Sequence, residues 1–207
     1  MESYSLYEVL LSKCFSSLLC EVSDTEWKSE KSETKNKSYE LFTKSGGDSF
    51  KMVKVIGQFN ANPIKVKDFI FAESSITKYD DSKESCTELV TGLNFKVFLT
   101  KGAKIFMLEP RDTVLLLGVK IEPNGTVLIA GCSVENEKTP EEKGRIRAHC
   151  EIMGYVLEPI LGEDNKCKFS YMEKIDPKGS VPAMIVNKMV KKRGETMMKL
   201  EQVVEKS

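Results

Sequence analysis

The longest periodic pattern of apolar residues lies at the C-terminus, in residues 179–206. Its members recur mostly at steps of three and four, which places them on one face of a helix: Val186, Val190, Met197, Leu200 and Val204. Arg193 interrupts this stripe, with Gly194 beside it, and Ser180 and Pro182 suit the start of a helix. We expect this helix to lie as a lid over the preceding strands.

The remaining pattern predicts two further helices and many strands. Residues 4–22 form an amphipathic pattern with Leu6, Val9, Leu10, Cys14 and Leu18 near one face, and Pro63 starts a second helix. A helical turn fits residues 76–79. Alternation predicts strands at 38–43, 50–56, 86–93, 95–100, 111–121, 126–134, 145–157 and 167–174. The Asn-Gly pair at 124–125 predicts a hairpin. The element order is therefore α+β, with a long antiparallel sheet in one domain spanning residues 1–207.

Composition narrows the function classes. The 207 residues carry a formal net charge of zero, so no basic field favours nucleic acid. No apolar run of about twenty residues predicts a transmembrane helix, and residues 1–20 do not resemble a signal peptide. The 6 cysteines form no C-x-x-C pair and fit reduced thiols in the cytosol. With His149 as the single histidine, a multi-histidine metal site is impossible, and we expect no cofactor.

Several sequence blocks at a characteristic spacing carry a resemblance. They are Arg111-Asp112 and residues 130–134, 140–148, 154–159, 175–182 and 185–187, preceded by Trp27-Lys28. Together they resemble the StAR-related lipid-transfer (START) domain family over essentially the whole chain. The resemblance implies a helix-grip fold (START/Bet v 1-like): a curved antiparallel sheet of about nine strands wrapped around the C-terminal helix, with an internal tunnel for one lipid.

The resemblance also implies a function and its moving parts. Family members bind sterols, phospholipids or ceramides and carry them between membranes or sense them. Residues 102–112 match the gating loop, residues 181–204 match the lid helix, and Arg111 begins a strand beside the tunnel. We expect a monomeric, cytoplasmic protein with one lipid ligand, transient contact with a membrane surface and no nucleic-acid partner.

Departures from the family pattern bear on the cargo. Tyr79-Asp80 stands where the family usually has Trp-Asp. Sterol carriers tend to place a buried basic residue where this chain has Leu117, and its acidic partner near Phe98. Because both positions are apolar here, phospholipid is slightly preferred over sterol.

The predicted lipid-binding residues combine the strand and lid patterns: Phe98, Arg111, Leu117, Val119, Ile129, Cys150, Glu151, Ile152, Ile185, Val186, Met189 and Val190. Parity along residues 145–157 places Cys150 and Ile152 toward the tunnel, although a bulge would mix the two sets. Glu151 is the candidate that orients a headgroup. The alternative is an ion-pair network that holds the sheet together, made by Arg111, Asp112, Arg145, Arg147 and Glu151.

A carrier must enclose its cargo and then open. Leaving a chain of about sixteen carbons in water costs roughly 13 kcal/mol, at about 0.8 kcal/mol per methylene. The candidate door is the apolar run Ile105, Phe106, Met107 and Leu108, beside a membrane contact formed by Lys191, Lys192 and Arg193. The simpler interpretations are a packed loop and a solvated helix face.

Three function classes remain open at this stage. The first is a non-enzymatic lipid carrier. The second is an enzyme or cyclase on the same scaffold, which would be favoured by Asp112 and Glu151 converging in a wet cavity. The third is a lipid-sensing regulatory module that acts through a protein partner.

Overall fold

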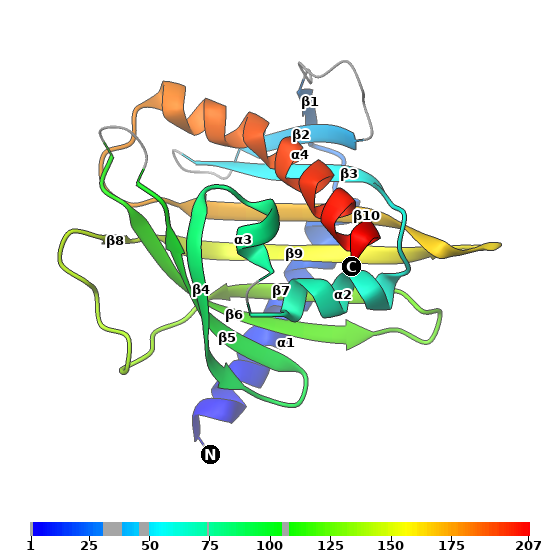
Figure 1. Cartoon of the computed structure of the whole chain (residues 1–207), viewed down its shortest axis with the longest axis horizontal. Coiled ribbons are helices and arrows are strands. Elements are labelled where there is room, and N and C mark those ends of the chain that lie inside the picture. The colour runs from blue at the N-terminus through cyan, green and yellow to red at the C-terminus, as the bar shows by residue number, and fades with distance from the viewer. Residues whose placement is uncertain (1, 31–38, 46–49, 74, 105–107) are drawn as a thin grey trace.

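The computed structural model describes residues 2–30, 39–45, 50–73, 75–104 and 108–207. A large sheet forms the centre, with α1 (Glu2–Ser23) on one face and α4 (Ala183–Lys206) on the other (Figure 1). Two shorter helices, α2 (Pro63–Phe71) and α3 (Ile76–Tyr79), lie on the same side as α4. The helices at residues 4–22 and 179–206, the helix starting at Pro63 and the turn at 76–79 are confirmed in type and approximate extent.

Among the described residues, ten strands make up the sheet, and the sequence pattern predicted most of them. They are β1 (Lys28–Glu30), β2 (Tyr39–Ser45), β3 (Lys51–Phe59), β4 (Lys83–Thr91), β5 (Phe95–Gly102), β6 (Arg111–Ile121), β7 (Val127–Ser133), β8 (Ile146–Arg147), β9 (His149–Ile160) and β10 (Glu163–Asp176). The order across the sheet is β1-β2-β3-β10-β9-β7-β6-β5-β4, so β1 and β4 are its two edges and the sheet stays open.

All neighbours along this path pair antiparallel, and only β8 pairs parallel, with the start of β6. The single strand predicted for residues 145–157 is therefore two strands, divided at Ala148. The predicted hairpin between β6 and β7 is present. Gly125 has φ +84°, and the Asn124 side chain accepts a 3.0 Å hydrogen bond from the Thr126 amide.

The face of α1 that packs on the sheet differs in part from the predicted one. Cys14 and Leu18 are buried as expected, and Tyr7 and Leu11 join them. Leu6 and Val9 instead point to solvent, with 56% and 51% of their surface exposed. The buried residues recur at steps of four, three and four, and this stripe is rotated away from the predicted one.

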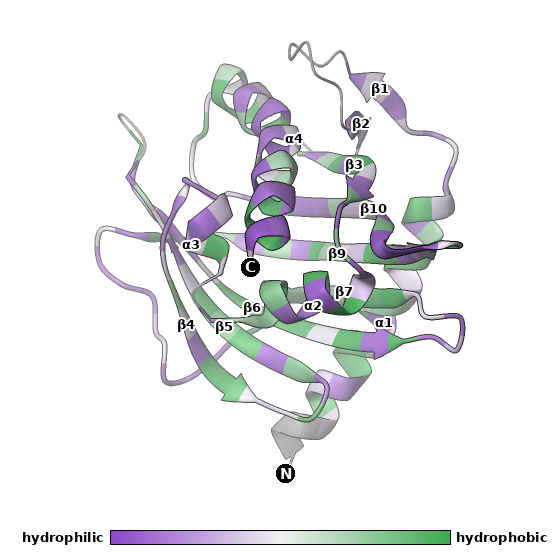
Figure 2. Cartoon of the chain, turned by 45° about the vertical axis from the view of Figure 1, so that its right-hand side comes forward, coloured by the Kyte–Doolittle hydropathy of each residue, from purple (hydrophilic) through white to green (hydrophobic). Residues whose placement is uncertain are grey.

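The opposite face carries the main apolar core, between the sheet and α4. Val190, Met197, Leu200 and Val204 of α4 are buried there, and Val186 is half-buried. Figure 2 shows hydrophobic stretches of β6, β7 and β9 below α4 and α2. The α4 helix begins at Ala183 with Pro182 as its N-cap residue and no side-chain cap, so the predicted capping role of Ser180 was wrong. Within the described part of the chain, no helix is both long enough and apolar enough to cross a bilayer.

Candidate functional site

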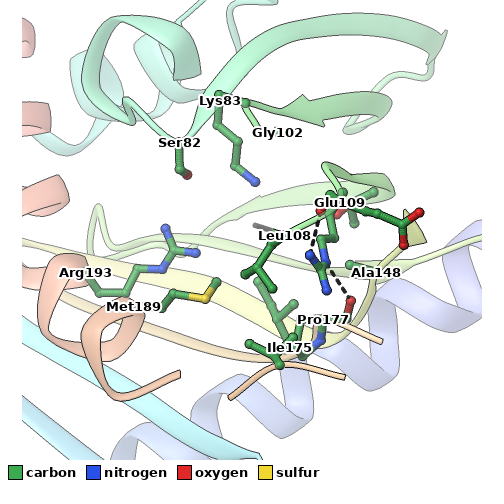
Figure 3. Close-up of a pocket in the computed structure, with 14 residues that line it drawn as sticks. Ser82, Lys83, Gly102, Leu108, Glu109, Ala148, Ile175, Pro177, Met189 and Arg193 are labelled. Atoms are coloured by element: carbon green, nitrogen blue, oxygen red, sulfur yellow. Dashed lines mark hydrogen bonds between the residues drawn. The ribbon is translucent and has the colours of Figure 1, made fainter. Parts of the chain in front are cut away.

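A cavity of about 90 Å³ lies between the first half of α4 and one end of the sheet. Its walls come from the start of β4, the connection between β5 and β6, the start of β6, the end of β10 and α4. Figure 3 shows Ser82, Lys83 and Gly102 on one wall, facing Arg193 and Met189 on the other. The described residues that line it are Ser82, Lys83, Gly102, Ala103, Leu108, Glu109, Arg111, Thr113, Ala148, Ile175, Pro177, Val181, Met189 and Arg193.

A second cavity, of about 60 Å³, adjoins the first and lies beneath α3 and α4. The two cavities share four lining residues: Lys83, Thr113, Ile175 and Arg193. The second cavity is more aromatic, because Tyr79, Tyr155 and Tyr171 contribute to its wall. A mixed polar and apolar hollow therefore runs between the lid helix and the sheet.

Arg193 provides the electrostatic centre of this hollow. Its guanidinium donates to the carboxylate of Glu173 on β10, and at 3.1 Å to the carboxylate of Asp80 after α3. The hydroxyl of Tyr171 donates to the other oxygen of Glu173. The predicted membrane contact through Arg193 was therefore wrong. The side chain points inward because two buried carboxylates need a positive partner.

The pKa values in this cluster follow from burial and neighbouring charge. Burial alone would lower the pKa of Arg193, but Glu173, Tyr171 and Asp80 outweigh it and raise that pKa well above its usual value. Burial alone would likewise raise the pKa of Asp80, but the positive charges of Arg193 and Lys83 lower it. Burial raises the pKa of the Tyr171 hydroxyl. Arg193 and Asp80 thus stay charged at neutral pH.

Lys83 has a different environment from Arg193. A tight turn places it, because its amide donates to the Asp80 carbonyl at 2.9 Å. Its side chain projects into the first cavity (Figure 3). In the described residues, the Lys83 ammonium forms no hydrogen bond and has no carboxylate within ion-pair distance. Burial lowers the pKa of Lys83, and the charges of Asp80 and Glu173 only partly offset this.

Arg111 ties the residues just before β6 to the residues that connect β10 to α4. Its guanidinium donates to the carbonyls of Glu109 at 2.6 Å, Pro177 at 3.4 Å and Lys178 at 3.4 Å. It lines the first cavity, so one side chain links the β5–β6 connection to the β10–α4 connection at the mouth of the hollow.

The sequence model of the START domain matches residues 12–199, which is most of the chain. The chain belongs to the START domain family. No curated protein is similar enough in sequence to be matched with this chain.

Solved structures agree with this START fold. Human STARD10 superposes with a TM-score of 0.81 at 20% identity, over 93% of this chain and 78% of that one. Human StAR-related lipid transfer protein 5 superposes with a TM-score of 0.83 at 19% sequence identity, and the match covers 99% of this chain and 97% of that one. A STAR-related lipid transfer protein fragment from Xanthomonas axonopodis superposes with a TM-score of 0.75 at 14% sequence identity, and the match covers 87% of this chain and 99% of that one.

Some of the residues predicted for the lipid site line the two cavities of this START domain: Arg111, Cys150 and Met189. Leu108, which was predicted for the door, also lines the first cavity. Others lie in the apolar core on the same face without lining a cavity: Phe98, Leu117, Val119, Ile129 and Val190. Ile185 and Val186 are half-buried on α4 and line neither cavity. Lys191 and Lys192 are exposed. Ile105, Phe106 and Met107 lie outside the described residues.

Two predicted residues lie on the wrong face of the sheet. Glu151 pairs with Lys174 at 2.8 Å, and Ile152 packs in the core beneath α1. For Ile152 the cause is a change of register, since β9 advances from Cys150 to Ile152 while β10 advances by a single residue. Glu151 follows the buried Cys150 directly and so points to the opposite face. Strict alternation fails at this bulge, and Tyr155 and Leu157 face the core under α4 instead of Val156.

The remaining strand charges form the ion-pair network that was the alternative to a ligand site. Arg147 holds the buried Asp112 carboxylate through two bonds, of 2.6 Å and 3.1 Å. Arg145 donates to the Gly102 carbonyl at 2.8 Å and to Glu84 at 2.9 Å. Asp112 and Glu151 thus have separate partners and do not converge on a cavity.

Sequence reasoning missed Lys83 and Glu173 as site residues. One signal was available, because a charged residue at Arg193 inside an apolar stripe requires a buried partner of opposite sign. Phe169, Tyr171 and Glu173 alternate along β10 and share one face, so Glu173 could have been chosen as that partner. No comparable sequence pattern identifies Lys83, because the direction of its side chain depends on the turn at residues 80–83.

Proposed function

We propose that this START domain binds a single lipid between its sheet and α4 and transfers it between membranes without chemical reaction. The observation that carries the proposal is the hollow between the lid helix and the sheet, which reaches the connection between β5 and β6. Membership of the START family supports the same function.

The hollow as it stands is smaller than a bound lipid requires. Cavities of about 90 and 60 Å³ are well below the roughly 300–1,000 Å³ typical of ligand pockets. A lipid therefore enters only when α4 and the β5–β6 connection separate. Such lid motions usually take microseconds to milliseconds. The groups that hold the lid are Arg193, with its two carboxylates, and Arg111 at the mouth.

For the cargo, we favour a phospholipid over a sterol. Phe98 and Leu117, at the positions where sterol carriers tend to have a charged pair, are both buried and apolar. The charged groups of this chain lie instead around Lys83 and Arg193. We assign the twelve residues predicted above to this site, except Glu151 and Ile152, which face α1.

The membrane-facing end is the start of α4 together with the gate segment. Met184 has 79% of its surface exposed there, and Lys191 and Lys192 are exposed on the same helix. We propose that Ile105, Phe106, Met107 and Leu108 complete this surface and that the monomeric domain docks transiently on the cytoplasmic side of a membrane. Each exposed lysine near anionic lipid contributes about 1 kcal/mol.

An enzymatic function on the same scaffold has less support. The single histidine, His149, is exposed and lines neither cavity of the hollow. Asp112 is held by Arg147 and Glu151 by Lys174, so no acid–base pair converges on the hollow. The Arg193 guanidinium is held by the carboxylates of Asp80 and Glu173, so none of these three groups is a free acid or base.

The proposal is tested by loading the full chain from vesicles and weighing it by native mass spectrometry. A carrier gains the mass of one lipid and moves a fluorescent analogue from donor to acceptor vesicles. A chain that gains no lipid mass and does not change the spontaneous transfer rate would falsify the proposal.

A further inference from the structure

Lys83 is an unusual group in this hollow, because its side chain is half-buried and its ammonium has no direct partner among the described residues. It belongs to the walls of both cavities, so any ligand between α4 and the sheet passes close to it. Its ammonium makes no hydrogen bond or ion pair with any residue that the structure describes. A buried ammonium carries three donors, and leaving them unpaired is costly.

The neighbouring acceptors are already engaged. Asp80 accepts from the Ser82 amide at 3.0 Å and from the Ser82 hydroxyl through one oxygen, and from Arg193 through the other. Glu173 accepts from Arg193 through one oxygen and from Tyr171 through the other. The cluster therefore holds its own carboxylates in place and leaves the donors of Lys83 directed at the cavity.

We propose that the Lys83 ammonium binds an anionic oxygen group of the lipid cargo, such as the phosphate of a phospholipid or the carboxylate of a fatty acid. The inference rests on the proposed carrier function and adds the class of headgroup. Such a group offers several acceptor oxygens and a negative charge to a buried ammonium. A lone sterol hydroxyl would satisfy one donor and none of the charge.

The surroundings of Lys83 fit an anionic head on an apolar tail. The 90 Å³ cavity has room for a few water molecules or one small polar group. Leu108, Val181 and Met189 line the side of the cavity formed by the gate and the lid, where a tail would emerge. Glu109 is exposed, and its carboxylate points away from the cavity (Figure 3).

The test compares cargo between the wild-type chain and three variants. Lys83→Met removes the ammonium and keeps the bulk, whereas Lys83→Arg keeps a positive charge. Lys120→Met is the matched control, since it removes a lysine of β6 whose side chain is 59% exposed and pairs with Glu122. Each full chain is incubated with vesicles of phosphatidylcholine alone, with added oleate or with added cholesterol, then re-isolated and weighed by native mass spectrometry.

We expect the wild type to carry phospholipid or oleate, and the mass of the bound lipid identifies phosphate or carboxylate as the ligand group. Lys83→Met should bind that lipid about ten- to a hundredfold more weakly, the effect of losing one or two charge-assisted hydrogen bonds. The affinity of Lys83→Arg for that lipid should stay within severalfold of the wild-type affinity, and Lys120→Met should bind it as tightly as the wild type does.

The outcomes separate the two proposals. A wild type that loads from none of the vesicles overturns the carrier function and this inference with it. Equal loading of the same lipid by the wild type and Lys83→Met overturns the inference alone, as does a wild type that takes only cholesterol. If Lys83→Met fails to fold by circular dichroism, the cargo of the wild type and of Lys83→Arg decides: phospholipid or oleate in both supports the inference, and loss from Lys83→Arg overturns it.

Discussion

Arg193 of α4 donates a hydrogen bond of 3.1 Å to Asp80, a residue 113 positions earlier in the chain. Asp80 follows α3 and precedes β4, so the bond joins the lid helix to the far edge of the sheet. The same guanidinium binds Glu173 on β10. One side chain thus fastens α4 to two separate parts of the wall, and the proposed opening of α4 would have to break both pairs.

Replacing Arg193 with Met should destabilise the fold and loosen the lid. Removing one partner from a buried charge pair costs about 3–5 kcal/mol, because the opposite charges stay buried without compensation. We expect chemical denaturation to show a loss of this size, and lipid to leave the loaded chain faster.

Lys199→Met is the matched control for this variant. Lys199 also joins α4 to the α3–β4 turn, through Asp81, but both side chains are about half exposed. Exposed pairs contribute about 0–1 kcal/mol. Equal losses from the two variants would show that Arg193 does not act as a buried fastening.

The same cluster predicts how stability depends on acid. The pKa of Asp80 is lower in the folded chain than its ordinary value of 3.8, because Arg193 and Lys83 outweigh the effect of burial. A carboxylate with a lowered pKa stabilises the fold above pH 3.8, and this contribution is lost as the pH falls through the folded pKa.

We therefore compare the wild type with Asp80→Asn by urea denaturation between about pH 5 and pH 2, the range in which such carboxylates take up protons. As the pH falls, the free energy of unfolding of the wild type should decrease more steeply than that of Asp80→Asn. The difference between the two slopes corresponds to at most one bound proton, which is about 1.4 kcal/mol per pH unit. Parallel curves for the two proteins would contradict the assignment of a charged Asp80.

The sequence was sufficient for the architecture because apolar periodicity and turn chemistry are local. The extents of α2, α3 and β6 follow from Pro63, from a short helical pattern and from a long apolar run, and Asn124-Gly125 gives the hairpin. Phe98, Leu117 and Ile129, which were predicted for the lipid site, lie in the apolar core on the α4 face, because alternation holds along β5, β6 and β7.

The predictions from sequence were wrong at positions where a bulge or a tertiary contact overrides the local residue pattern. Alternation placed Ile152 under the lid, but the bulge between Cys150 and Ile152 turns it toward α1. Three consecutive basic residues suggested a surface patch, but helical geometry directs Lys191 and Lys192 outward and Arg193 inward. The opposing carboxylates lie on β10 and after α3, and only the fold brings them together.

The cysteines offer a check on packing that needs no ligand. Cys20 on α1 is exposed, whereas Cys167 on β10 is buried. Burial raises the pKa of the Cys167 thiol to about 12, so little thiolate forms at neutral pH. A short maleimide pulse followed by peptide mapping should modify Cys20 first and leave Cys167 intact until the chain is unfolded. Early labelling of Cys167 would mean that the β10 core opens readily.

Gly194 allows α4 to approach the sheet closely, and a small substitution should reveal this. A Cβ atom at Gly194 would lie 2.0 Å from the ring of Tyr39 on β2, so helix and ring cannot both stay in place. Alanine normally stabilises a helix interior by about 1 kcal/mol over glycine. The overlap opposes this by about 1–3 kcal/mol. Gly194→Ala should therefore leave stability unchanged or lower it by up to about 2 kcal/mol, and hold α4 further from β2.

A double-mutant cycle separates the two effects. In a Tyr39→Leu background the ring is gone, so Gly194→Ala should there stabilise the chain by about 1 kcal/mol, as helix propensity alone requires. The interaction free energy between the two sites is then of the order of 1–3 kcal/mol. If Gly194→Ala has the same effect in both backgrounds, the ring does not limit the approach of α4. If the overlap does displace α4, the alanine variant should also release bound lipid faster than the wild type, because the lid starts from a more open position.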